Sequence, residues 1–247
     1  MTAPDFVKDL LGWRAKESPK GGRNPNTSDS GSSTSVAIAA RILDLLDIPT
    51  NAIRSDDPGI GLEEGVLAYI EAELPKLAPD RAWLFFRGKK VTDFAQYEHL
   101  AQIQKIIKED ESKTLGVEIG RDYVIKPDVT VGVKTDRSLL LHAAVSCKWT
   151  IRSDRVQNIR HEAVILTRHR RGRQPHIVAV TAEPLPSRLA SIARGTGEID
   201  AVYHIAFEEI LDAVTDVGTH GEQEVLAELV EQDRLLDFTA LPNILRF

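Results

Sequence analysis

The chain has few of the residues and segments that define several common protein classes. It contains one Cys in 247 residues, which excludes a disulfide framework and a Cys-rich zinc site and favours a reducing compartment. The His residues form no cluster, and no segment reaches about 18 uninterrupted apolar residues, the length of a membrane-spanning helix. The start of the chain mixes acids with bases and does not resemble a signal peptide. We therefore expect a cytoplasmic location and no membrane partner.

The composition is that of a folded protein with a sizeable core. Apolar residues make up 42% of the chain and charged residues 28%, and the formal net charge is -6. The length suits one large domain or two small ones. A mildly acidic total usually argues against nucleic acid as a partner, but only if the charge is evenly spread.

The charge is not evenly spread. Between Lys148 and Arg173, eight Lys or Arg side chains and two acids give a local charge of +6, which leaves -12 for the remaining residues. A basic segment within an acidic chain is typical of a surface that faces phosphates. The alternative is an ordinary solvated helix followed by a basic loop.

Apolar spacing predicts a chain that is mainly helical at first and mixed afterwards. Residues 15–35 are rich in Ser, Gly, Pro and Asn, and this composition favours a flexible arm. Two apolar, partly alternating runs at 123–133 and 139–149 predict a hairpin. The other predicted elements are helices at 35–47, 62–74, 93–108, 153–167, 187–193 and from about 207, and strands at 176–182 and 201–205. Strands alternating with helices after a hairpin predict a mixed α/β sheet covered on both faces.

An acid and a base meet at one end of the predicted hairpin. If the hairpin closes with Val133 near Leu141, Asp128 falls opposite Ser146, and Lys148 lies one diagonal step away. The sequence thus predicts a carboxylate and an ammonium together at the edge of the sheet.

A second carboxylate lies on the helix that follows this strand. Glu162 stands at the margin of the apolar face of helix 153–167, so its side chain can reach back toward the strand ends. Asp128 and Glu162 could hold Mg²⁺, with Lys148 as the cation near a phosphate, and this set suits phosphodiester hydrolysis. Arg155 precedes Glu162 by two helical turns on the same face. A surface salt bridge near a strand end is the alternative interpretation of these charges.

Cys147 invites a different interpretation, a Cys–His hydrolase, because His142 and His161 are near it in sequence. Strand alternation puts Cys147 on the face that carries Leu141 and opposite the face of His142 and Lys148. A packed core cysteine is therefore the favoured interpretation.

The segments SCKWTIRSDRVQNIRHEA and HIVAVTAEPLPSRLASIARGTGEIDAVYH resemble the NgoMIV-type restriction endonucleases of the PD-(D/E)xK nuclease superfamily. The similarity is dense over about residues 127–207 and thinner before them. It implies a restriction-endonuclease-like core, in which a central mixed β-sheet is flanked by helices. It also implies Mg²⁺-dependent cutting of double-stranded DNA, a homotetramer that engages two target sites, and pairing with a cognate DNA methyltransferase.

The resemblance assigns a role to each member of the acid–base set. Ser146 stands where the superfamily usually has an acid, and it is counted among the residues that face DNA. An acidic ligand from the following helix replaces the missing carboxylate. A further glutamate matches best to Glu63 in LEEGVLAYI, with the adjacent Glu64 as an alternative. The catalytic set implied in this way is Asp128, Lys148, Glu162 and Glu63, and all but Lys148 would bind metal.

Base reading has a physical argument beside the resemblance. Arginine forks suit the O6 and N7 acceptors of guanine, and a carboxylate accepts from the N4 amine of cytosine. Arg152, Asp154 and Arg155 therefore suit G·C pairs and, by resemblance, read an inner CCGG. Arg188 in PSR and Asp29 in the arm are assigned to the outer pair, which implies the target GCCGGC, cut after the first G to leave 5′ overhangs. The arm would then become ordered against DNA.

We interpret residues 1–247 as one nuclease domain. Its parts are an N-terminal arm (1–35), a mainly helical part (36–110), a catalytic and DNA-reading α/β core (111–207) and C-terminal helices (208–247). Two alternatives stay open at this point: a non-catalytic, sequence-specific DNA-binding protein, and a nuclease of the same fold that acts in repair or recombination. The first would show no Mg²⁺-dependent cutting, and the second would cut at no fixed site.

Overall fold

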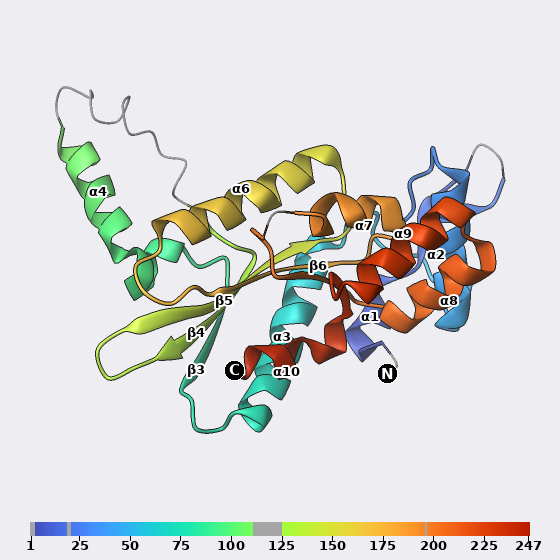
Figure 1. The fold of residues 1–247 in the computed structure, drawn as a ribbon. Coiled ribbons are helices and arrows are strands. Elements are labelled where there is room, and N and C mark those ends of the chain that lie inside the picture. The colour runs from blue at the N-terminus through green and yellow to red at the C-terminus, as the bar shows by residue number, and fades with distance from the viewer. Residues whose placement is uncertain (1–2, 19–20, 111–124, 196) are drawn as a thin grey trace.

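A six-stranded mixed sheet forms the centre of the protein in the computed structural model, which describes residues 3–18, 21–110, 125–195 and 197–247. The strands follow one another across the sheet in chain order (Figure 1). The first two pairs of neighbours, β3–β4 and β4–β5, are antiparallel, and the three pairs from β5 to β8 are parallel. Their bounds are β3 (Trp83–Arg87), β4 (Val129–Lys134), β5 (Leu139–Lys148), β6 (His176–Thr181), β7 (Ala201–His204) and β8 (Leu235–Asp237). The predicted α/β class is confirmed.

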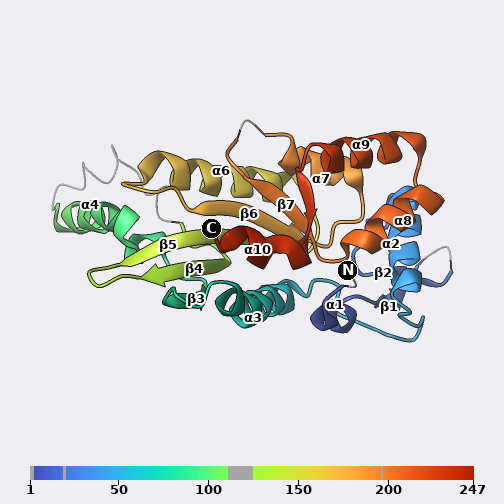
Figure 2. The same cartoon turned by 60° about the horizontal axis from the view of Figure 1, so that its bottom comes forward.

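Helices cover both faces of this sheet (Figure 2). The apolar stripe of α3 (Gly59–Leu77) packs with the β4 and β5 side chains of one face, and α6 (Ser153–His169) packs on the other. The other helices of the described residues are α1 (Asp5–Leu10), α2 (Ser33–Leu45), α4 (Glu98–Glu109), α7 (Pro186–Ala193), α8 (Phe207–Val217), α9 (His220–Glu231) and α10 (Leu241–Leu245), with 3-10 turns at Val91–Asp93, Ala95–Tyr97 and Phe238–Ala240. No helix of the described ranges is long and apolar enough to cross a membrane.

Several predicted elements form close to their expected bounds, and others were missed. The helices predicted at 35–47, 62–74 and 153–167 correspond to α2, α3 and α6, whereas residues 123–124 of the first predicted strand lie outside the described residues. The part predicted to be mainly helical, 36–110, contains α2, α3 and α4, but it also contains the strand β3, which was not predicted. The strand β8 was not predicted either. Both strands are short, so neither shows enough alternation to be distinguished from a loop.

A β-bulge changes the predicted register of the hairpin. Val129 pairs with Val145 and Val131 with Ala143, but Val133 pairs with Leu140 and not with Leu141. The register shift lies between Val131 and Gly132. It preserves the expected alignment at the end of the hairpin that carries Asp128, while the end near the turn is shifted by one residue.

The bulge also changes the face of the sheet on which some β5 side chains lie, so the faces predicted from regular alternation were partly wrong. Leu141 lies in the cluster beneath α6, together with Ala144, although alternation predicts opposite faces for these two residues. His142, which opposes no residue of β4, instead contacts the backbone oxygen of Leu245 in α10 at 2.6 Å. Cys147 is 4% exposed among core residues, and burial raises its pKa well above the usual range. Cys147 is therefore a core cysteine, as predicted. The argument that put Cys147 and His142 on opposite faces was wrong, because it assumed regular alternation across the bulge at His142.

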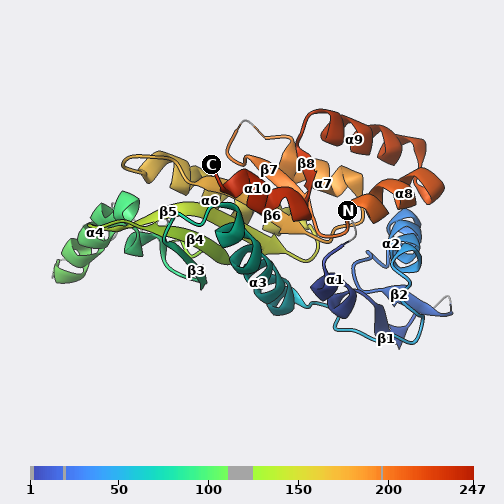
Figure 3. The same cartoon turned by 90° about the horizontal axis from the view of Figure 1, so that it is seen from below.

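The N-terminal segment is not the flexible arm that its composition favours. β1 (Trp13–Glu17) and β2 (Arg23–Pro25) form a small antiparallel sheet beside α1 and α2 (Figure 3). Asn26 is 1% exposed, and its side-chain amide donates to the carbonyl oxygens of Leu10 and Ser55 at 2.8 and 2.9 Å. The Trp149 indole in turn donates to the Asn26 carbonyl oxygen. Side-chain hydrogen bonds thus order a segment that has little apolar content.

We predict that Asn26→Ala lowers the free energy of unfolding by about 2 to 4 kcal/mol, because it leaves buried backbone groups without their hydrogen-bond partners. Urea denaturation measures this loss. Asn243→Ala, at an exposed position of α10, is the control and should change the free energy by less than about 0.5 kcal/mol. Equal effects of the two substitutions would contradict the anchoring role of Asn26.

Candidate functional site

Asp128 and Lys148 meet at the end of the β4–β5 ladder. Asp128 immediately precedes β4, and Lys148 is the last residue of β5. The Lys148 ammonium donates to Asp128 Oδ2 at 2.6 Å, and the Cys147 backbone N–H donates to the same oxygen at 2.7 Å. About a fifth of each side chain is exposed, 22% for Asp128 and 23% for Lys148, so the pair remains accessible to a ligand. The expected acid–base contact therefore forms.

Glu162 reaches this pair from α6. Lys148 and Asp128 both contribute to its electrostatic environment, and its carboxylate is hydrogen-bonded to the Ser146 hydroxyl. Burial is the main cause that raises the pKa of Glu162, followed in the same direction by the negative charge of Asp128. Ser146 is only 7% exposed, which favours support of Glu162 over direct contact with DNA.

α3 supplies a third carboxylate, and the structure separates the two candidates for it. Burial raises the pKa of Glu63, and the charge of Asp128 adds to this effect. Glu64 is 62% exposed and forms an ion pair with Arg87, whose guanidinium also lies 3.8 Å from Glu63. Glu63 is thus the residue that faces Asp128 and Lys148, while Glu64 is directed toward solvent.

The chemistry of this donor set fits a hard divalent cation. Three carboxylates from three elements converge on Lys148, and the charge of Asp128 disfavours the ionised form of the other two. A bound cation would remove that repulsion. In the described part of the chain, however, no three His, Cys, Asp or Glu side chains are already arranged as metal ligands. Lys148 is the cation that Asp128 contacts directly in this structure.

Four of the five predicted base-reading residues line a cleft of about 880 Å³. Arg152 and Arg155 come from the start of α6, Arg188 from α7, and Asp29 from the loop that precedes α2. Asp154 is exposed on the first turn of α6 but is not among the residues that line the cleft. Segments separated by more than a hundred residues thus form one concave surface.

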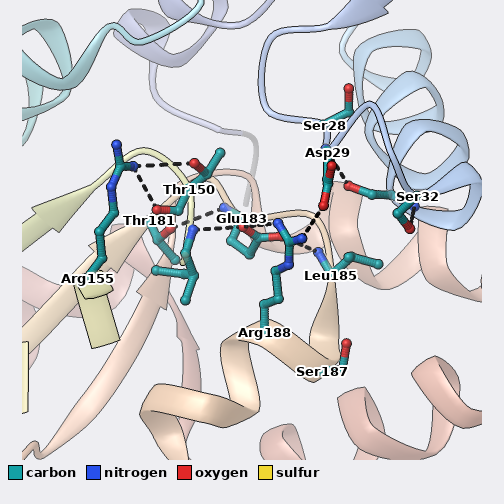
Figure 4. A network of polar contacts seen from close by, with 12 residues as sticks. Ser28, Asp29, Ser32, Thr150, Arg155, Thr181, Glu183, Leu185, Ser187 and Arg188 are labelled. Atoms are coloured by element: carbon teal, nitrogen blue, oxygen red, sulfur yellow. Dashed lines mark hydrogen bonds and ion pairs between the residues drawn. The ribbon is translucent and has the colours of Figure 1, made fainter. Parts of the chain in front are cut away.

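Two arginines of the cleft, Arg155 and Arg188, are paired with acids or with backbone oxygens, and Figure 4 shows part of this network. Arg188 forms an ion pair with Asp29, and this contact together with the Gly31 backbone N–H lowers the pKa of Asp29. Arg155 donates to the Thr150 carbonyl oxygen at 2.9 Å and to Asp57 at 3.1 Å. The guanidinium groups of Arg155 and Arg188 are therefore held in place before any ligand binds.

The basic segment is spread along the whole length of α6. Arg152 and Arg155 lie at the start of α6, whereas Arg168, Arg170, Arg171 and Arg173 lie at or beyond its end. Seventeen helical residues separate these ends by about 25 Å. The mid-helix Arg160 donates to the backbone oxygens of Ser191 and Arg194. The interpretation of the segment as a phosphate-facing surface therefore stays a prediction, and only its first two arginines line the cleft.

Two acidic residues near the cleft were not found from the sequence. Asp57 pairs with Arg155. Glu183 is 0% exposed and accepts hydrogen bonds from the backbone N–H groups of Ile151, which precedes Arg152, and Leu185, which lies near Arg188. The position of Glu183 could have indicated a role, because an acid directly after a buried strand and before PSR is unusual. Nothing in the local sequence predicts the contact of Asp57, which depends on the loop before α3 lying beside the start of α6.

Known restriction enzymes are similar to this chain in sequence. The family model described as NgoMIV restriction enzyme matches residues 13–137 and 132–247. The type II restriction enzyme NgoMIV of Neisseria gonorrhoeae is 35% identical over an alignment of 253 positions, which covers 88% of this chain and 88% of that protein.

A solved structure of a related kind also matches. It is the crystal structure of the pre-specific restriction endonuclease BsaWI in complex with DNA, with 15% sequence identity and a TM-score of 0.34. The match covers 70% of this chain and 63% of the BsaWI chain, and a likeness of this size carries no argument by itself.

The family model accounts for nearly the whole chain, and the curated relative is similar along most of both sequences. The chain therefore belongs to the NgoMIV restriction enzyme family and is a site-specific endonuclease.

Proposed function

We propose that this endonuclease hydrolyses phosphodiesters of double-stranded DNA at a palindromic GC-rich site, GCCGGC, cutting after the first G to leave 5′ overhangs. The observation that carries the proposal is the contact of Lys148 with Asp128 at 2.6 Å, with Glu162 and Glu63 directed at the same pair. A carboxylate cluster with one ammonium suits metal-assisted phosphodiester hydrolysis, because it offers ligands for a divalent cation and a donor for the charge that develops on the phosphate.

In this proposal Asp128 and Glu162, with Glu63, hold Mg²⁺. When bound, Mg²⁺ lowers the pKa of a coordinated water and offsets the negative charge that develops on the phosphate. The Lys148 ammonium donates to the phosphate or to the attacking water and stabilises that charge. Ser146 keeps the Glu162 carboxylate in position through its hydroxyl.

Sequence recognition is assigned to the cleft that Figure 4 shows in part. Arg152, Asp154 and Arg155 read the inner CCGG, and Arg188 with Asp29 reads the outer pair, because guanidinium and carboxylate groups match the edges of G and C. The exposed position of Asp154 on the first turn of α6 is compatible with contact to a base at the mouth of the cleft. Arg188 would have to exchange its Asp29 contact for guanine.

The proposal extends to the partners of the enzyme. We propose a homotetramer, a dimer of dimers, that engages two DNA sites and acts with a cognate DNA methyltransferase in the cytoplasm. Family membership supports these assignments. A non-catalytic DNA-binding protein and a nuclease of repair or recombination are the two alternatives, and each would give a different result when a sequenced plasmid is digested.

Digestion of a sequenced plasmid tests the proposal directly. With Mg²⁺ the enzyme should produce one set of ends at GCCGGC, and with EDTA it should produce none. Lys148→Ala should lower the cleavage rate by about 100- to 1,000-fold, because it removes one charge-stabilising donor. Lys134→Ala, at the exposed far end of β4, is the control and should cut normally.

Full cleavage by Lys148→Ala would refute the proposed mechanism. Binding of GCCGGC without any Mg²⁺-dependent cutting would identify a DNA-binding protein, and cuts at no fixed sequence would identify a repair or recombination nuclease.

Arg188→Ala should relax the preference at the outer base pair, with a loss of about 1 to 3 kcal/mol of discrimination. Cleavage rates on duplexes that carry GCCGGC or a changed outer pair measure this discrimination. Arg194→Ala is the matched control, because Arg194 directly follows α7 and pairs with Glu228. An equal loss of rate on all duplexes would show that Arg188 contacts phosphate and does not read a base.

A further inference from the structure

Glu183 is a fully buried carboxylate at the back of the cleft. It follows β6 by two residues and precedes α7, and it is 0% exposed. Burial raises its pKa to about 7, whereas two backbone hydrogen bonds and Arg188 act in the opposite direction. A buried ionisable group is costly unless it is fully paired, so the number and position of its partners are informative.

The two oxygens of Glu183 bind two different DNA-facing segments. Oε2 accepts from the backbone N–H of Ile151 at 2.8 Å, and Oε1 accepts from the backbone N–H of Leu185 at 3.1 Å. Ile151 directly precedes Arg152, and Leu185 caps the start of α7, which carries Arg188. Figure 4 shows this carboxylate between the two segments. One side chain therefore spans the segments to which inner and outer base reading are assigned.

Arg188 itself lies between two carboxylates. One of its terminal nitrogens is 3.9 Å from Glu183 Oε2, and the other pairs with Asp29. Glu183 is inaccessible, whereas the Asp29 side chain is 38% exposed at the surface of the cleft. Release of Asp29 would free one edge of the guanidinium for a base, while Glu183 would continue to hold the other.

We propose that Glu183 is a positioning residue for sequence recognition, which sets the spacing between the Arg152 segment and α7 and restrains Arg188 from behind. This inference rests on the proposed function of Arg152 and Arg188 in base reading. It differs from a purely structural role in one respect: loss of Glu183 changes discrimination at the inner and outer base pairs together, although Glu183 touches no DNA.

Glu183→Gln tests this coupling with almost no change in shape. An amide has one oxygen, so it can accept from only one of the two backbone N–H groups, and its NH₂ opposes the other. Cleavage rates are measured on three duplexes: GCCGGC, a variant of the outer pair and a variant of an inner pair. We expect the preference for GCCGGC to fall about tenfold against both variants, since one good bidentate base contact contributes discrimination of this order. Arg188→Ala should reduce only the outer-pair preference.

A matched control separates positioning from general loss of stability. Gln96 is 4% exposed and makes two side-chain hydrogen bonds to the backbone of Leu141, away from the cleft. Gln96→Met should lower the melting temperature without changing discrimination. Glu183→Asp is a second variant, which keeps the charge but is one methylene too short to reach both N–H groups.

The outcomes distinguish the inference from the function on which it rests. If wild-type enzyme cuts at no fixed site, the proposed function fails and Glu183 has no readers to position. If wild-type enzyme cuts at GCCGGC and a folded Glu183→Gln or Glu183→Asp keeps wild-type discrimination at both pairs, the positioning role is refuted. A change of discrimination with Gln96→Met equal to that with Glu183→Gln would refute it as well.

Discussion

The antiparallel pairing of β4 with β5 is the constraint on which the candidate catalytic site depends. Val129 opposite Val145 sets Asp128 against the last residues of β5, where its carboxylate contacts the Cys147 N–H and the Lys148 ammonium. A slip of one residue at this end would turn Lys148 away from α6 and destroy the contact. The bulge lies farther along the hairpin, so it changes the register near the turn without disturbing this end.

The site is electrostatically unfavourable by itself, as functional sites often are. Burial raises the pKa of Glu63 and Glu162, and Asp128 adds further repulsion. Lys148 and Arg87 offset part of this repulsion for Glu63. These acids are brought together by α3 and α6, which pack on the sheet, and by the start of β4 within it. The apolar packing of these elements is favourable and offsets the electrostatic repulsion between the acids.

The cleft uses charge in a different way. Asp57 pairs with Arg155, and Asp29 and the buried Glu183 lie against Arg188, so these two guanidinium groups are preorganised and part of their positive charge is offset. A cleft whose charge is partly offset attracts phosphates less strongly than a bare basic surface, and discrimination then depends on contacts with base edges. Neither the net charge of -6 nor the local charge of +6 between Lys148 and Arg173 predicts the charge of the cleft, because most arginines of that segment lie at the two ends of α6.

The sequence by itself determined the α/β class, most of the described helices and the hairpin. It also contains Asp128, Lys148 and Glu162 at positions that regular strand and helix periods bring together. Spacing along β5 and α6 was sufficient to predict the contact of Asp128 with Lys148 and the approach of Glu162, because these elements are adjacent in the chain and follow regular periods. The sequence could not reveal the strand β3, the ordered segment around Asn26 or the bulge that moves Leu141.

Only the tertiary structure decided between Glu63 and Glu64 as the acid that faces the site, brought Asp29 to Arg188, and placed Glu183 between the reading segments. These contacts join residues from distant parts of the chain, and no local period encodes which distant side chain will satisfy a buried charge or a backbone N–H.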